Sequence, residues 1–193
     1  MSKKTSRGAP RRGTRRRPPV LDALPVHVLA IDASSHAVGW AYFCQGNLEA
    51  CGVVTERSGN LVERLYRLSF GLVADISNHI AIHKDRINDT ALICETASGL
   101  RRAEKTSPRT TAVLGFAQGF IAGRLCLGYG FGPLVLLPDN TWTKGKNKQK
   151  RQAIMIASEP VYAAFAPRDK GADAADAVGL GRYAIYMEEY RNV

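Results

Sequence analysis

The chain has 193 residues, enough for one ordinary α/β domain whose core needs no disulfide or metal to be stable. Its hydrophobic fraction of 45% fits a soluble globular protein, and the apolar stretch 112–137 is interrupted by Arg124, glycines and Pro133, which argues against a membrane span. The formal net charge of +10 points to nucleic acid. Eight of the 27 basic side chains, however, lie within residues 1–18, and the remaining chain carries 19 basic against 17 acidic residues.

The basic segment forms an arm, residues 1–24, that is rich in Arg, Lys, Ser, Gly and Pro. We expect the arm to be disordered, because it has too few apolar side chains to offset the entropy of ordering. Counterion release would make it a sequence-independent, salt-sensitive binder of phosphates. A solubilising tail and an organellar transit peptide are the alternatives. Since no secretory hydrophobic segment follows the arm, we expect a cytoplasmic protein, in the host cytoplasm if a phage encodes it.

The folded domain, residues 25–193, begins with a part rich in β-structure. Apolar runs predict three strands, at residues 28–32, 38–43 and 48–54. Leucine and isoleucine then recur at helical spacing from Leu61 to Ile80, which predicts an amphipathic helix of about five turns.

The second half of the domain alternates strands and helices. Strands are predicted at residues 91–95 and 133–137, and helices at 110–127, 150–164 and 172–190. A polar, basic loop should precede the first of these helices, and a Lys-rich loop should follow the last strand. The order β-β-β-α-β-α-β-α-α indicates an α/β fold with a mixed sheet covered by helices on both faces.

Four carboxylates lie where acidic residues are normally avoided. Asp32 and Glu95 each end an apolar strand, whereas Asp173 and Asp176 lie in the small-residue helix near the C-terminus. A buried carboxylate without a partner is costly, so such groups need a cation or a cluster of donors. The strand ends could meet at one sheet edge, and the three-residue spacing places the helical pair on one face within reach of a common ion. Because Mg²⁺ prefers oxygen ligands, the sequence predicts a metal site.

Each acid also has a simpler interpretation. Asp173 could cap the helix N-terminus or interact with its dipole, and Glu95 could form a buried ion pair with a loop arginine.

Basic side chains follow the strands 91–95 and 133–137 and should emerge at the same end as the acids. In that position they would hold phosphates rather than read bases, unless the lysine run is only a solvated turn. The candidates for DNA binding are Arg101, Arg102, Lys105, Arg109, Lys144, Lys146, Lys148, Lys150 and Arg151.

The cysteines form neither a CxxC pair nor a zinc-type spacing. We expect reduced core thiols, with a bridge between Cys44 and Cys51 across a hairpin as the alternative.

At the acidic residues the sequence resembles the RuvC-type Holliday junction resolvases, which belong to the RNase H-like nuclease superfamily. The matching segments are 28–35 with 38–41 for the family's first strand and its return, 92–95 for its glutamate strand, 114–119 for the next helix, and 173–177 for its C-terminal acidic pair. The resemblance spans about residues 27–187, and the order of the four acids agrees with the family.

The resemblance implies an RNase H-like fold and a two-metal-ion crossover junction endodeoxyribonuclease. The implied ligands of two Mg²⁺ ions, which Mn²⁺ can replace, are Asp32, Glu95, Asp173 and Asp176. The implied substrate is branched DNA, above all four-way junctions in recombination and repair, cleaved by paired hydrolysis that leaves 5′-phosphate ends. A lysine of the second loop (Lys144, Lys148 or Lys150) would lie near the scissile phosphate.

Paired nicks need two active sites, so the resemblance also implies a homodimer. The helix 110–127, with Phe116 and Phe120, could provide the interface, although burial within its own domain is the simpler explanation.

Three competing functions remain open. The first is an RNase H-like nuclease with broader substrates such as forks, flaps or RNA–DNA hybrids. The second is a small-molecule kinase-like or actin-like ATPase domain, which is disfavoured because residues 32–35 lack the glycine that lets backbone approach a phosphate. The third, a DNA-coating protein that acts through its arm, leaves the four acids without a role.

Overall fold

The structure is a computed structural model that describes residues 26–79, 87, 89–96 and 107–189. The arm lies outside these residues, so its disorder stays a prediction. Arg101, Arg102 and Lys105 also lie outside them, as does most of the basic loop that was expected before the helix 110–127.

A five-stranded mixed sheet forms the centre of the domain. Its strands are β1 (His27–Ala33), β2 (Ala37–Cys44), β3 (Asn47–Thr55), β4 (Thr90–Thr96) and β5 (Leu134–Pro138). They are arranged in the order β3-β2-β1-β4-β5. β1, β2 and β3 pair antiparallel, whereas β4 runs parallel to both β1 and β5. The predicted mixed sheet is therefore confirmed.

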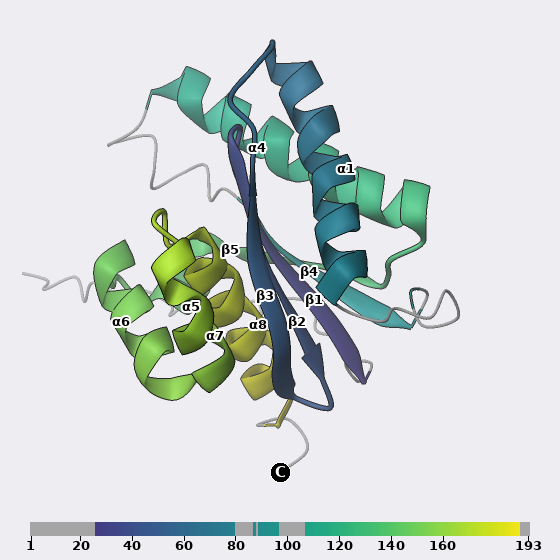
Figure 1. Cartoon of the computed structure of the whole chain (residues 1–193). Helices are drawn as coiled ribbons and strands as arrows, with labels where there is room; N and C mark the ends of the chain where they lie inside the picture. Colours follow the sequence, from purple (N-terminus) through teal and green to yellow (C-terminus); the bar gives the residue numbers. More distant parts are fainter. Residues whose placement is uncertain (1–25, 80–86, 88, 97–106, 190–193) are drawn as a thin grey trace, which may run out of the picture.

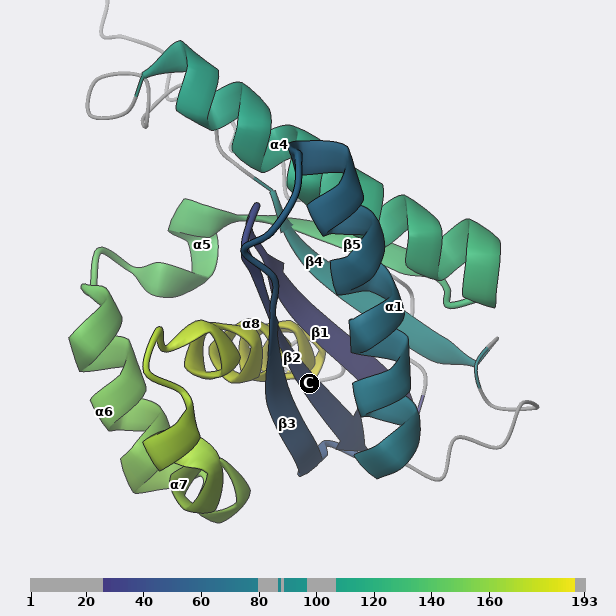
Figure 2. The ribbon, with the colours of Figure 1, turned by 45° about the horizontal axis from the view of Figure 1, so that its top comes forward.

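Helices cover both faces of the sheet (Figure 1). The helical segments are α1 (Leu61–His79), α4 (Pro108–Gly123), η1 (Arg124–Gly128), α5 (Asp139–Thr143), α6 (Lys148–Ser158), α7 (Pro160–Phe165), η2 (Ala166–Arg168) and α8 (Asp173–Glu189). In both Figure 1 and Figure 2, α1 and α4 lie on one side of the sheet, and α8 lies on the other side with α6 and α7.

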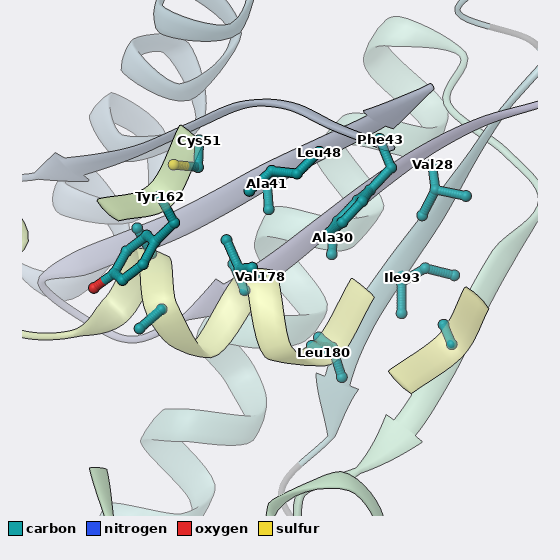
Figure 3. Packing of buried hydrophobic residues seen from close by; sticks show 14 of the residues in the cluster. Val28, Ala30, Ala41, Phe43, Leu48, Cys51, Ile93, Tyr162, Val178 and Leu180 are labelled. Atoms are coloured by element: carbon teal, nitrogen blue, oxygen red, sulfur yellow. The ribbon is translucent and has the colours of Figure 1, made fainter. Parts of the chain in front are cut away.

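The alternation of side chains along the strands divides the core into two clusters. Val28 and Ala30 of β1 join the cluster on the α8 side, and Leu29 and Ile31 join the cluster under α1 and α4. Strand residues i and i+2 share a face, which explains this division. Figure 3 shows the first cluster, where Val178 faces the strands from α8. Asp32, two residues beyond Ala30, thus belongs to the face that α8 covers.

Close approach of α8 to the sheet depends on small residues in both elements. On α8, three alanines are completely buried against the sheet: Ala174, Ala175 and Ala177. On β2, a Cβ at Gly39 would lie 2.0 Å from the carbonyl oxygen of Asp173, so only glycine allows the start of α8 to lie where it does. The small side chains of α8 thus let the helix lie close to the sheet, and Gly39 is the matching residue on the strand.

Two predictions for the C-terminal half of the chain were wrong. The single helix expected over 150–164 is broken between α6 and α7, because Pro160 lacks an amide hydrogen and Glu159 before it is extended at φ −124° and ψ 96°. A short helix, α5, stands where only a loop was expected.

The helix predicted over 110–127 is confirmed, since α4 continues directly into η1. Arg124 and the glycines, which argued against a membrane span, do not break this helix. Pro108–Gly128 forms 21 residues of helix with a hydropathy of 1.3, long and apolar enough to cross a membrane on those criteria alone. Of its most apolar 18-residue window, 28% is buried in the domain. Arg124 is accommodated because its guanidinium carbon lies 5.0 and 5.4 Å from the ring centres of Tyr66 and Phe70 on α1.

All four cysteines are free thiols, as expected. The alternative bridge between Cys44 and Cys51 is wrong, because Cys51 belongs to the core on the α8 side and Cys44 packs against the core on the opposite face.

Candidate active site

The ends of β1 and β4 bring Asp32 and Glu95 together. The two strands are parallel neighbours, and Ile31 pairs with Cys94 in register. Each acid is the residue immediately after this pair, so the two stand side by side at one edge of the sheet, on the face that α8 covers. Glu95 is buried and Asp32 is half-buried.

The other two acids lie in the first turn of α8, whose start is held by Asp169. One oxygen of Asp169 accepts from the amide of Asp173, and the other accepts from the amide of Ala175 and the hydroxyl of Tyr162, each at 2.9 Å. Asp169 is 1% exposed. The capping acid is therefore Asp169 rather than Asp173, and this leaves the carboxylate of Asp173 available for other contacts.

Sequence reasoning missed Asp169. Its position four residues before the acidic pair, beside Gly171, was the available signal, because an Asp just before a helix is a common cap.

Two basic side chains from the start of α6 pair with the acids of α8. The Nζ of Lys148 lies 2.6 Å from Asp173 Oδ1 and 3.6 Å from Asp176 Oδ2. Arg151 donates from Nε and Nη2 to the two oxygens of Asp176, both at 2.7 Å. The helical pair thus does reach a common cation, and that cation is the ammonium of Lys148.

The acids and the bases meet in one pocket of about 280 Å³ at the edge of the sheet. Its polar lining combines the carboxylates from β1, β4 and α8 with the two bases of α6. The lining residues are Asp32, Ala33, Ser34, Glu95, Leu114, Gln118, Thr143, Lys148, Arg151 and Asp176. Six separate helices and strands contribute to it, which explains why the site could not be seen as one motif in the sequence.

The electrostatics of the pocket are most visible at Asp32. Burial raises the pKa of its carboxyl to about 7, and the nearby carboxylates of Asp176 and Asp173 add to this rise. The positive charges of Lys148 and Arg151 oppose it without cancelling it. With Asp173 beside it, the pocket brings four carboxyl groups together with two bases, and this excess favours a further cation.

The donor set fits a hard divalent cation in chemistry, because it consists of carboxylate oxygens from rigid elements. Among the described residues, however, no three His, Cys, Asp or Glu side chains are arranged to hold a metal ion as they stand. Lys148 contacts one oxygen of Asp173, and Arg151 takes both oxygens of Asp176. Metal binding by all four acids would require these bases to move.

The remaining basic candidates lie around the pocket rather than in it. Lys144 ends α5 in the left-handed region at φ 47°, Lys150 is exposed in the first turn of α6, and Arg109 is exposed at the start of α4. Lys146 is half-buried, and its carbonyl accepts from Nη1 of Arg151 at 2.7 Å. Of the three lysines considered for the scissile phosphate, Lys148 is the one whose amine lies in the acid pocket.

The likeness of this chain to known proteins lies in its fold. No family model and no curated protein matches the chain. Two solved structures of RuvC from Thermus thermophilus do match the fold. One, in complex with a Holliday junction substrate, has a TM-score of 0.56 at 17% identity and covers 86% of this chain and 96% of that chain. The other has a TM-score of 0.57 at 18% identity and covers 85% and 96%.

The chain has a RuvC-type fold. The match spans most of both chains, so the similarity concerns the fold as a whole. At this level of identity the similarity concerns the arrangement of the backbone, and the chemistry rests on the residues of this chain.

Proposed function

We propose that this protein is a metal-dependent endonuclease that cleaves branched DNA, above all four-way junctions, and leaves 5′-phosphate ends. One observation carries the proposal: carboxylates from β1, β4 and α8 share a pocket with two bases of α6 on a RuvC-type fold. The RuvC of similar structure has been captured with a Holliday junction substrate, which favours the same class of DNA here. We place the activity in the cytoplasm, or in the host cytoplasm for a phage protein.

In this proposal each group of the pocket has a distinct part. Asp32, Glu95, Asp173 and Asp176 would hold two Mg²⁺ ions, or Mn²⁺ in their place. When bound, such ions supply an activated water and stabilise the leaving 3′ oxygen. The amine of Lys148 would pair with the scissile phosphate. Asp169 keeps the carboxylates of α8 in position by fixing the start of that helix.

The test is cleavage of a labelled, mobile four-way junction by the full-length protein in Mg²⁺. We expect two symmetric nicks with 5′-phosphate ends, and a fall of at least about a hundredfold in rate for Asp176→Asn, because a lost ligand removes several kcal/mol of transition-state stabilisation. Asp89→Asn is the matched control, since Asp89 is exposed and lies before β4, away from the pocket.

Parallel substrates separate this function from its relatives. Faster cleavage of a fork, a flap or an RNA–DNA hybrid than of the junction would favour a nuclease of broader range. Full activity of Asp176→Asn on the junction would contradict the proposal.

We further propose that the protein acts as a homodimer through the face of α1 and α4, because paired nicks need two sites. Large apolar side chains are exposed on this face: Val62, Tyr66, Phe70, Phe116 and Leu127. A groove of about 390 Å³ between α4 and β5 extends it and is lined by Gly115, Gly119, Leu134 and Leu136 among others. Exposed apolar patches of this kind mark association surfaces. Phe116 itself is 47% exposed, so burial within its own domain does not account for it.

We expect Phe116→Asp to convert a dimer to a monomer, since it places a charge on the proposed apolar interface. Light scattering after size-exclusion chromatography measures the mass directly. Ile156→Asp is the matched control, because Ile156 is similarly exposed at 46% but lies on α6, on the other side of the sheet. Equal masses for wild type and both variants would contradict the placement of the interface.

A further inference from the structure

Arg151 engages both oxygens of Asp176, the acid of the α8 pair that lines the pocket. Its Nε and Nη2 lie 2.7 Å from different carboxylate oxygens, the two-pronged geometry that makes Arg–carboxylate pairs strong. The side chains are 17% and 5% exposed, so water screens the pair only weakly. A divalent cation that used Asp176 would have to displace this guanidinium.

Further contacts hold Arg151 in place. Its Nη1 donates to the carbonyl of Lys146 at 2.7 Å, and its guanidinium carbon lies 5.2 Å from the ring centre of Trp142. The start of α6 is fixed in turn, because the side chain of Asn147 accepts from the amide of Lys150 at 2.9 Å. Arg151 is thus anchored over Asp176 rather than resting there by chance.

We propose that Arg151 is a built-in competitor of the divalent cation at Asp176, and that a DNA phosphate relieves the competition by taking the guanidinium. This inference rests on the proposed function, because it requires that the pocket binds both a divalent cation and a phosphate. Arginine pairs with phosphate in the same two-pronged manner as with carboxylate, so the exchange keeps its hydrogen bonds satisfied.

The exchange links the two ligands. If phosphate frees Asp176 for the cation, the cation must strengthen phosphate binding by the same factor. The metal site would then be completed when DNA is present, and a protein without DNA would bind the cation weakly. Lys148, which bridges Asp173 and Asp176, would move with Arg151, since both bases contact Asp176.

The first test is calorimetric titration of the full-length protein with Mn²⁺ in the absence of DNA. We expect Arg151→Gln to bind Mn²⁺ at least about tenfold more tightly than wild type, which is about 1.4 kcal/mol. Lys150→Gln is the matched control, because it removes the same charge from the adjacent, exposed position of α6. A gain in Arg151→Gln no larger than that in Lys150→Gln would overturn the proposal.

A double-mutant cycle shows whether the gain passes through Asp176. In an Asp176→Asn background, Arg151→Gln should no longer raise Mn²⁺ affinity beyond the charge effect of the control. An unchanged gain in that background would overturn the proposed competition.

The phosphate half of the proposal needs a third arm, with a non-cleavable four-way junction at saturation. We expect the junction to raise the Mn²⁺ affinity of wild type several-fold and to raise that of Arg151→Gln much less. No effect of DNA on the wild-type affinity would refute the exchange.

Failure of the proposed function would show itself separately. In that case no branched DNA is cleaved by the wild type, whatever the Mn²⁺ affinities of the variants.

Discussion

Asp32→Asn should abolish cleavage and yet raise the stability of the protein at neutral pH. Burial raises the pKa of the Asp32 carboxyl to about 7, and the negative charges of Asp176 and Asp173 add to this rise. An asparagine of the same shape removes the charge and keeps the packing. We expect a gain of about 2 to 4 kcal/mol in unfolding free energy at pH 8 without metal, as a shift of one pKa unit corresponds to about 1.4 kcal/mol.

The direction of the pH dependence follows from the raised pKa. Between pH 4 and 7 the folded protein keeps a proton on Asp32 that the unfolded chain has released, so stability from this group is present at low pH and is lost as the pH rises towards 7. Thermal melting in EDTA at several pH values measures this. The difference between Asp32→Asn and wild type should grow from pH 4 to pH 8.

The same melting experiment is then repeated with Mg²⁺ in place of EDTA. The ion should raise the melting temperature of wild type, because a ligand that binds only the folded state stabilises it, and should raise that of Asp32→Asn much less. A wild type that is more stable than the variant at pH 8 in EDTA would contradict the assigned electrostatics. Such a trade of stability for function is common at active sites.

The sequence predicted the sheet and the strand acids well because both follow from local patterns. Apolar runs located all five strands, and the position of Asp32 and Glu95 directly after two of them was sufficient to place both at one edge once the strands were parallel neighbours. Periodicity also found α1, α4 and α8. These are features in which neighbouring residues decide the local structure.

The arrangement within the site could not be predicted from the same patterns. Whether Lys148 or Lys150 enters the pocket depends on where α6 begins, which is decided by the cap at Asn147 rather than by charge. The pairing of Arg151 with Asp176 joins residues 25 positions apart on different helices. A run of basic residues predicts phosphate binding in general, but only the packing of α6 against α8 distinguishes the members of that run.

The break at Pro160 shows the limit of periodicity for the fold itself. Apolar and small residues continue on both sides of it, so the pattern indicated one helix. The proline nevertheless separates α6 from α7, and the separation lets Tyr162 of α7 reach Asp169 at the start of α8. The boundary between α6 and α7 therefore helps to hold the start of α8, and with it the carboxylates of Asp173 and Asp176.

Gly39→Ala should disrupt the acid pocket, although Gly39 lies on β2 and does not line that pocket. A Cβ there would lie 2.0 Å from the carbonyl oxygen of Asp173 and 2.7 Å from the amide nitrogen of Ala174, and neither backbone atom can rotate away. The start of α8 must shift, so its packing on β1 and β2 is lost together with the position of its two carboxylates. We expect a loss of about 3 kcal/mol in unfolding free energy, measured by urea denaturation, and a cleavage rate reduced at least as far as in Asp176→Asn.

Gly128→Ala separates this effect from the general cost of replacing a glycine, since no atom lies within 4 Å of a Cβ at that position. It should change the unfolding free energy by less than about 1 kcal/mol. If Gly39→Ala were as stable as this control and bound Mn²⁺ normally, the contact between β2 and the start of α8 would not be what positions the acids. If Gly39→Ala stays folded but loses Mn²⁺ binding, the distance between strand and helix controls the metal site, because the carboxylates themselves are unchanged.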